Sequence, residues 1–330
     1  MRTGLIYSER FLQHDTGPGH PERPDRLLAI HNQLQARGLL DALAPLPFGL
    51  ADRRWLELVH TPTYVERVFA ACEAGEPYID SADSTTCPQS AEIAQLAAGG
   101  AITAVDAVMA GELHNAFCAM RPPGHHAEAN LSMGFCLFNH VAIAAAYLIR
   151  RHGLQRVAIV DFDVHHGNGT QHLFERRSDV LFISMHQDPR HLYPGTGHAH
   201  ETGRDAGEGY TLNVPLPPDS GDDVYLNALR SKVLPKLEAF DPQFLLLSAG
   251  FDASARDPLA HMLMTPKGFG QLTRELRAVA ETHCRGRLVS LLEGGYHLEE
   301  LANSVCHHVR ALHETDAHDV APRASTQMKT

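Results

Sequence analysis

Four short apolar runs along the chain each end abruptly in polar or glycine-containing sequence. They span residues 157–160, 180–184, 244–248 and 288–292. Short runs rich in Val, Ile, Leu and Phe are typical of strands buried on both faces. Longer segments with helical spacing lie between them. The pattern therefore predicts an α/β fold with a single, mostly parallel, multi-stranded sheet flanked by helices on both faces.

Polar side chains follow each of these runs. The polar segments are residues 161–163, 185–186, 249–252 and 293–296. Ligands of open α/β sheets bind beyond the carboxyl ends of the strands. We therefore expect four segments that are distant in sequence to supply polar groups to one crevice.

Apolar residues at helical spacing predict seven helices. Their expected ranges are residues 23–37, 62–74, 90–110, 139–152, 222–239, 265–284 and 298–313. Stop signals near helix ends are expected at Gly38, Gly75, Gly111, Gly153 and Gly286. In the alanine-rich helix, Gly99 and Gly100 predict a close contact with the sheet. No repeat or linker is found, so residues 1–314 are expected to form one domain, followed by a weakly ordered tail at 315–330.

Composition argues against several classes of protein. The 330 residues carry a net charge of −11 without a Lys/Arg run, so we expect no nucleic-acid partner. The six cysteines lack Cys-x-x-Cys spacing, and there is no signal-peptide pattern or uninterrupted apolar run of membrane length. No GxGxxG or Walker pattern supports a nucleotide. We expect a reduced, cytoplasmic protein with no membrane partner, whose acidic surface suits a cationic ligand.

The end of the run at 157–160 carries the strongest chemical signal. Asp163 and His165 follow it directly, and residues two apart on an extended chain point the same way. A carboxylate and an imidazole can therefore converge on one point, which is a geometry that a divalent cation can use.

A second block, residues 121–128, reads Arg-Pro-Pro-Gly-His-His-Ala-Glu. The prolines and the glycine forbid a regular element, so backbone geometry fixes the adjacent His125 and His126. This suits a pair of acid/base groups at the bottom of a pocket. With 23 histidines in the chain, some pairs arise by chance, and the His307-His308 pair on a helical pattern is interpreted in that way.

Taken together, these motifs resemble the histone deacetylase superfamily, a group of metal-dependent amidohydrolases with the arginase/deacetylase fold. The resemblance covers nearly the whole chain. Its motifs are HPERP at 20–24, RPPGHHAE at 121–128, GFC at 134–136 followed by Asn139, DFDVHHGNGTQ at 161–171, PGTG at 194–197, SAGFDA at 248–253, DPL at 257–259 and EGGY at 293–296. The HHAE and GGY blocks resemble the deacetylase branch rather than the arginases, which bind two manganese ions through other residues.

The resemblance implies a catalytic zinc ion on Asp163, His165 and Asp252, with one coordination position left to water. Two carboxylates and one imidazole form a harder ligand set than most zinc sites, so iron(II) or cobalt(II) remain alternatives.

The resemblance also implies the catalytic side chains. They are His126 as general base and acid, His125 as its electrostatic partner, Tyr296 as donor to the oxyanion, and Asp161 and Asn168 as the partners of His125 and His126. Some family members carry an aspartate where this chain has Asn168, and the asparagine is typical of the class II branch.

Two sites for a structural potassium or sodium ion are implied as well. The first matches Asp161, Asp163, His165, Ser184 and Met185, and the second would use carbonyls of Phe174, Arg177, Val180 and Tyr210. Backbone ligands leave little trace in sequence, so the second site depends on the resemblance alone.

Phe135 and Tyr193 are expected to wall a channel for the methylene stem of an acylated lysine, and the Gly134 carbonyl could accept the substrate amide proton. Residues 84–86 lie near the position that grips the substrate backbone in relatives, although no single residue can be aligned. Arg26 matches a basic residue that lines an acetate exit in relatives, but a structural salt bridge explains it almost as well.

Three functions remain from the sequence. The first is a zinc-dependent deacetylase acting on acyl-lysine in proteins or peptides. Leu259 favours it, because one group of acetylpolyamine enzymes carries a glutamate there, and so does the lack of a long insertion between Ala74 and Cys87. The second is deacetylation of an acetylated polyamine, which the acidic surface would accept. The third is a catalytically silent acyl-lysine binder. The oligomeric state, the acyl-chain preference and the native metal are not predicted.

Overall fold

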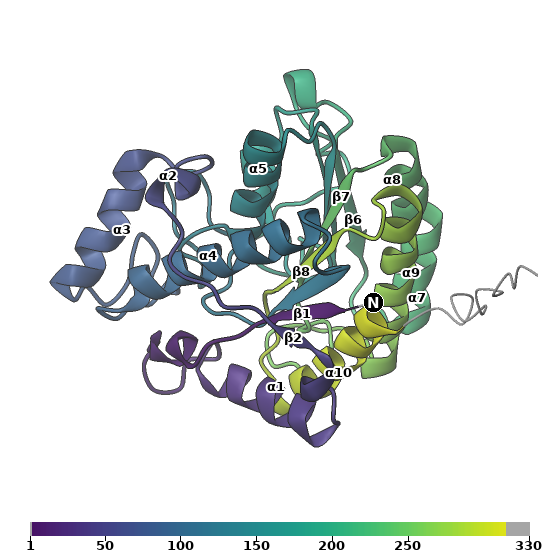
Figure 1. Ribbon diagram of the computed structural model, residues 1–330. Coiled ribbons are helices and arrows are strands. Elements are labelled where there is room, and N and C mark those ends of the chain that lie inside the picture. Colours follow the sequence, from purple (N-terminus) through teal and green to yellow (C-terminus); the bar gives the residue numbers. More distant parts are fainter. Residues whose placement is uncertain (1, 315–330) are drawn as a thin grey trace, which may run out of the picture.

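The computed structural model describes residues 2–314, so the tail expected from residue 315 onward lies outside the described residues. Its centre is one eight-stranded sheet with the order β2-β1-β3-β8-β7-β4-β5-β6 (Figure 1). The strands are β1 (Thr3–Ile6), β2 (Ala44–Pro45), β3 (Asn115–Cys118), β4 (Val157–Asp161), β5 (Val180–Gln187), β6 (Thr211–Leu216), β7 (Phe244–Ala249) and β8 (Leu288–Leu292). Every neighbouring pair is parallel, which confirms the expected parallel sheet.

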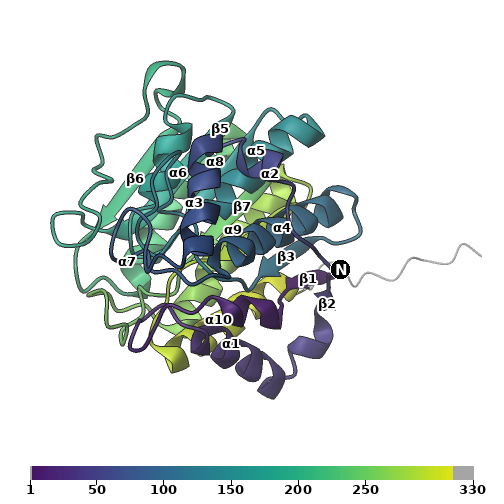
Figure 2. The same cartoon turned by 90° about the vertical axis from the view of Figure 1, so that its left-hand side faces the viewer.

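The four predicted strands are neighbours at the centre of the sheet, as β8, β7, β4 and β5. All their residues are buried, which explains why they read as unbroken apolar runs. β5 extends three residues further than expected, to Gln187. Figure 2 shows β6 and β2 at opposite ends of the sheet, where the sequence signal was weakest: β2 has two residues, and β6 contains a proline.

Helices cover both faces of the sheet (Figure 1). α4 and α5 contact the strands from one side, and α9 and α10 contact them from the other, with α1 packed on α10. The helices are α1 (Asp25–Ala36), α2 (Arg53–Leu56), α3 (Pro62–Ala74), α4 (Ser90–Met109), α5 (His140–His152), α6 (Asn168–Phe174), α7 (Asp222–Ala228), α8 (Leu234–Phe240), α9 (Pro266–His283) and α10 (Leu298–His313). This arrangement places every carboxyl strand end on one edge of the sheet.

Several helix boundaries differ from the predicted ones for identifiable reasons. Asn139 and Thr265 precede their helices as N-caps, and each side chain accepts a backbone N–H in the first turn. The predicted helix over 222–239 is interrupted by a π-helical turn, Leu229–Val233, just before Pro235. Proline cannot donate the helical hydrogen bond, so the backbone changes its pattern there. The short helix α6 was not predicted.

α4 is the one helix of the described residues whose length and composition would allow it to cross a membrane. Of its most apolar window, 72% is buried inside the protein, which identifies it as a core helix. A Cβ on Gly100 would lie 2.6 Å from Cγ2 of Ile6 in β1, and one on Gly99 would overlap the Gly49 carbonyl. The predicted close approach to the sheet is therefore confirmed for Gly100, whereas Gly99 packs against a loop.

A buried ion cluster joins the N-terminal segment to two loops at the carboxyl edge of the sheet. Glu22 pairs with Arg121 and Arg26, and all three side chains are fully buried. Arg26 also donates to the carbonyls of Glu293, at 2.5 Å, and Gly295, at 2.6 Å. Arg26 thus makes the structural salt bridge that the sequence left as an alternative. Its place along an exit path stays a prediction.

Glu22→Gln should lower the free energy of unfolding by about 3–5 kcal/mol at pH 7, because two buried guanidinium groups lose their counter-charge. Burial alone would raise the pKa of Glu22, but Arg121 and Arg26 outweigh it and lower the pKa to about 2. A lowered native pKa stabilises the fold above the unfolded value of 4.5, and this stability is lost as the pH falls from 4.5 towards 2. Urea unfolding of both proteins over this range measures the effect.

Glu92→Gln is the matched control, since Glu92 pairs with Arg10 on the exposed surface and should contribute less than about 1 kcal/mol. Equal stability of the two variants, or parallel acid profiles of wild type and Glu22→Gln, would contradict the role assigned to Glu22.

Candidate active site

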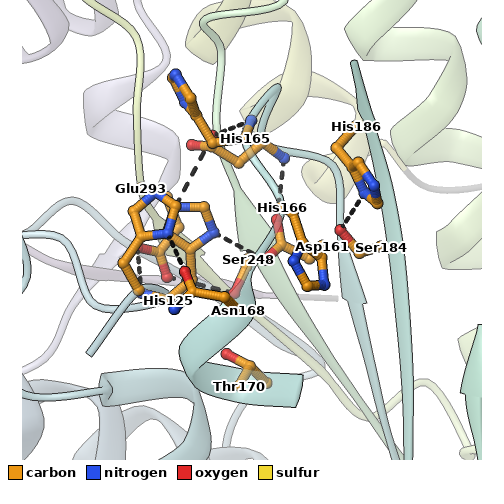
Figure 3. A network of polar contacts seen from close by, with 12 residues as sticks. His125, Asp161, His165, His166, Asn168, Thr170, Ser184, His186, Ser248 and Glu293 are labelled. Atoms are coloured by element: carbon orange, nitrogen blue, oxygen red, sulfur yellow. Dashed lines mark hydrogen bonds and ion pairs between the residues drawn. The ribbon is translucent and has the colours of Figure 1, made fainter. Parts of the chain in front are cut away.

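The candidate site lies where the central strands end. β4 ends at Asp161 and leads to Asp163 and His165, while β7 leads to Asp252 and β8 leads to Glu293. Figure 3 shows the labelled polar side chains of these segments gathered at this edge, with His165 above His125 and Asn168. Three of the four segments that were expected to converge therefore do so, whereas His186 of the fourth bonds Ser184 and the Gly197 carbonyl.

Asp163, His165 and Asp252 form a group whose ligand atoms lie within 4.8 Å of one another. Nδ1 of His165 is 3.0 Å from Oδ1 of Asp163 and 3.1 Å from Oδ2 of Asp252. Backbone N–H groups hold the other carboxylate oxygens: Gly294 donates to Asp163 at 2.8 Å, and Val164 donates to Asp252 at 2.9 Å. The carboxylates are thereby aimed at the imidazole.

Glycines make room for these two carboxylates. A Cβ on Gly250 would lie 2.1 Å from Oδ2 of Asp163, and one on Gly294 would lie 2.1 Å from Oδ2 of Asp252. Any larger residue at either position would push a carboxylate out of place. The glycines of the SAGFDA and EGGY motifs thus leave the space that the carboxylates of Asp163 and Asp252 occupy.

The charges of this group fit a bound cation. Burial and the Asp163 carboxylate raise the pKa of Asp252. Burial would also lower the pKa of His165, but bonds to Asp163 and Asp252 raise it to about 10. Two buried carboxylates thus draw positive charge to a point between them, and two carboxylate oxygens with one imidazole nitrogen are suitable ligands for a divalent metal ion.

Two adjacent imidazoles lie beside the metal group and have different partners. Nδ1 of His125 is 2.9 Å from Oδ2 of Asp161, and Nδ1 of His126 is 2.7 Å from Oδ1 of Asn168. The ring centroids are 4.0 Å apart. The structure therefore brings together both pairs that the resemblance implied.

These partners give the two imidazoles opposite pKa shifts. Burial lowers the pKa of His125, but the carboxylates of Asp161, Asp163 and Glu293 outweigh burial and hold the pKa well above its ordinary value. Burial, together with the positive charges of His125 and His165, holds the pKa of His126 well below its ordinary value. His125 is thus suited to remain protonated and His126 to act as a free base.

Glu293 is a buried carboxylate that sequence reasoning placed in a motif without assigning a role. Its Oε2 accepts the backbone N–H groups of Gly124 at 2.7 Å and His125 at 3.1 Å. Burial raises its pKa to about 7. Glu293 fixes the turn that carries both imidazoles. The only signal in the sequence was its position directly after a buried strand.

A cavity of about 220 Å³ leads to these groups. Its lining residues are Asp83, His126, Gly134, Phe135, His165, Leu192, Tyr193, Leu259 and Tyr296. All four expected channel residues are among them. Phe135 has a left-handed φ of 69°, a strained conformation in a turn that presents its ring to the cavity.

Asp83, and not a residue of 84–86, is the loop side chain at this cavity. Its Oδ2 accepts the Gly134 N–H at 3.3 Å, whereas Ser84 is fully buried. Residues 84–86 thus lie next to the side chain that reaches the cavity, and the residue that grips the substrate backbone stays a prediction. Leu192 was also missed, because a single leucine in a loop carries no pattern.

Tyr296 lines the cavity and is held from several sides. Its backbone N–H donates to Oδ2 of Asp257 at 2.6 Å, and the guanidinium of Arg26 lies 5.0 Å from its ring centroid. Burial, reinforced by the charge of Asp252, holds the pKa of Tyr296 well above its ordinary value. The phenol therefore stays protonated and can donate a hydrogen bond.

The residues expected at the two monovalent-cation sites lie near one another in each case. Asp161 and Ser184 are register partners on β4 and β5, and Met185 follows. Phe174 and Arg177 share a turn after α6, Val180 begins β5, and the Tyr210 carbonyl accepts the N–H of Phe182. The role of these residues as ion ligands stays a prediction.

Comparison with known proteins identifies the family. Residues 20–312 match the histone deacetylase domain. The histone deacetylase-like amidohydrolase of Pseudomonas aeruginosa is 43% identical over 89% of this chain and 82% of its own length. The human polyamine deacetylase HDAC10 is 39% identical over 94% of this chain and 48% of its own length.

A solved structure agrees with the sequence matches. The crystal structure of the HDA15 HD domain superimposes with a TM-score of 0.89 at 38% identity, covering 94% of this chain and 89% of that one. The eight-stranded parallel sheet is thus the arginase/deacetylase fold, and the chain belongs to the histone deacetylase family of amide-hydrolysing enzymes.

Proposed function

We propose that this enzyme removes acetyl or other short acyl groups from the side-chain amine of acyl-lysine in proteins or peptides. The observation that carries this proposal is the narrow cavity, walled by Phe135 and Tyr193, whose lining also includes His126, His165 and Tyr296. Two aromatic walls fit an extended methylene stem, and the polar groups beyond them fit a reacting amide.

A zinc ion, with iron(II) or cobalt(II) as alternatives, would be held by Asp163, His165 and Asp252 and would supply Lewis acidity to the acyl carbonyl and to water. His126 lines the cavity and has its Nδ1 bonded to Asn168, so its Nε2 is the nitrogen that takes the proton of the attacking water. The same nitrogen returns this proton to the departing lysine amine.

Two other side chains stabilise charge as the amide is cleaved. The protonated His125 lies against His126 and supplies positive charge near the reacting groups. The Tyr296 hydroxyl, protonated and on the cavity wall, donates to the oxyanion that develops on the acyl oxygen.

A second candidate substrate is an acetylated polyamine. The relative named a polyamine deacetylase and the net charge of −11 support it. Leu259 at the cavity supports the lysine substrate instead, because an apolar side chain offers no partner to a second ammonium group.

Potassium or sodium binding at the two expected sites belongs to the same proposal. A cation beside Asp161 would fix the end of β4, from which two metal ligands follow. Six free cysteines support a reducing compartment such as the cytoplasm.

Tyr296→Phe should lower kcat on an acetyl-lysine peptide by about 10²–10³-fold, because only the oxyanion donor is removed. His126→Ala should lower kcat by about 10²–10⁴-fold, because the acid/base group is lost. Steady-state kinetics with a thermal-unfolding check measure both effects. A Tyr296→Phe enzyme with full activity would refute the role of the phenol.

The purified protein should hold one equivalent of divalent metal, and Asp252→Asn should lose it, because a neutral amide is a much weaker ligand than a carboxylate. Elemental analysis of the dialysed proteins gives the metal content. Asp83→Asn is the control, since Asp83 lines the same cavity without belonging to the metal group, and it should retain the metal. Retention of the metal by Asp252→Asn would contradict the ligand set.

Wild type should show a higher kcat/KM on acetyl-lysine peptides than on acetylputrescine or acetylspermidine. Leu259→Glu should shift this ratio towards the polyamines by about tenfold, the effect of one ion pair of about 1.4 kcal/mol. Leu259→Gln has the same size without the charge and serves as control. If the wild type prefers the polyamines, the acetylated polyamine becomes the favoured substrate in place of acyl-lysine.

A further inference from the structure

An amide, rather than a carboxylate, orients the His126 imidazole. Oδ1 of Asn168 lies 2.7 Å from Nδ1 of His126, and because this oxygen can only accept, Nδ1 carries the ring proton. Nε2 is then unprotonated and available to the cavity. This is the tautomer that a general base requires.

An amide alone does not determine this tautomer. The oxygen and nitrogen of an asparagine side chain are nearly equal in size, so a half-turn about the last bond exchanges them. In the reversed orientation Nδ2 of Asn168 would donate to Nδ1 of His126, and the ring proton would have to move to Nε2. A residue beyond Asn168 must therefore select the orientation.

Glu128 is in the position to do so. Nδ2 of Asn168 donates to Oε1 of Glu128 at 3.0 Å and lies 3.3 Å from Sδ of Met133. Both neighbours accept, and neither can donate. Reversal would bring the amide oxygen against the Glu128 carboxylate, so the bond would be replaced by a repulsion between two acceptors.

Glu128 acts from outside the substrate channel. It is not among the residues that line the channel, but it lines a separate flank cavity of about 380 Å³, together with Asn168, His172 and Glu175. Its side chain is 23% exposed, and its Oε2 lies 3.8 Å from Nδ1 of the half-exposed His172. A change at Glu128 can therefore alter the chemistry without touching the bound substrate.

We propose that Glu128 is a positioning residue that fixes the orientation of the Asn168 amide and thereby the catalytic tautomer of His126. The inference rests on the proposed function, because it assigns His126 the task of general base. Glu128 supplies through a neutral amide the selection that a carboxylate bonded to Nδ1 would make directly, since a carboxylate can only accept.

The loss of kcat caused by a substitution at Glu128 should depend on whether the new side chain donates or accepts hydrogen bonds. Glu128→Gln removes the charge but keeps an oxygen, so kcat should fall about tenfold, the effect of weakening one hydrogen bond to a charged group. Glu128→Lys offers only donors and favours the reversed amide, so kcat should fall by about 10² or more. KM should change less than about twofold in both variants. The control Glu175→Gln, in the same flank cavity, should leave both constants unchanged.

The direction in which Glu128→Gln changes kcat in two backgrounds distinguishes a positioning role from a merely structural one. Asn168→Asp places a carboxylate against Glu128, so in this background Glu128→Gln replaces a repulsion with a donor. We expect Glu128→Gln to lower kcat in wild type and to raise kcat in the Asn168→Asp enzyme. A residue that only supports the fold would lower kcat in both backgrounds.

Kinetics of the six proteins, including the Asn168→Asp/Glu128→Gln double variant, on one acetyl-lysine peptide decide the question. Glu128 variants that match Glu175→Gln, or that lose kcat equally in both backgrounds, overturn the role of Glu128 while leaving the proposed function intact. A wild-type enzyme without activity on acyl-lysine, even when loaded with zinc, overturns both.

Discussion

The site depends on holding two carboxylates, Asp163 and Asp252, against each other in the protein interior. Separate strands deliver them, backbone N–H groups orient them, and bare glycine backbone at Gly250 and Gly294 leaves room for them. Charges buried in this way are stable only with compensating positive charge. The parallel sheet brings the ends of β4 and β7 side by side, so that both carboxylates meet the His165 imidazole, whose pKa they raise.

The charges around the site also explain why the two adjacent imidazoles differ in pKa. Both lie on one turn, yet His125 faces carboxylates and His126 faces an amide. Their pKa values are therefore driven apart, and one protonated and one free imidazole can stand 4.0 Å from each other. The proposed proton transfer by His126 depends on this difference, because an imidazole that already carries a proton on both nitrogens cannot accept another one.

The sequence predicted those parts of the molecule that follow from short-range patterns. The central strands appear as apolar runs because both of their faces are buried, and the polar residues at their ends locate the site. Asp83, Leu192 and Glu293 were missed because their roles arise from contacts between loops that are distant in sequence. The seven-residue α6 and the π-helical turn before Pro235 fall below the length at which helical periodicity can be detected.

The buried ion cluster that stabilises the fold also binds the loops that carry the candidate site. Arg26 donates to the carbonyls of Glu293 and Gly295, the residues that lead to Tyr296, and it is itself neutralised by Glu22. Glu22 also binds Arg121, at the start of the turn that carries His125 and His126. One buried carboxylate thus connects the loop that carries Tyr296 to the turn that carries His125 and His126. None of these three charged side chains lines the cavity, so the relative position of the two loops is set from outside it.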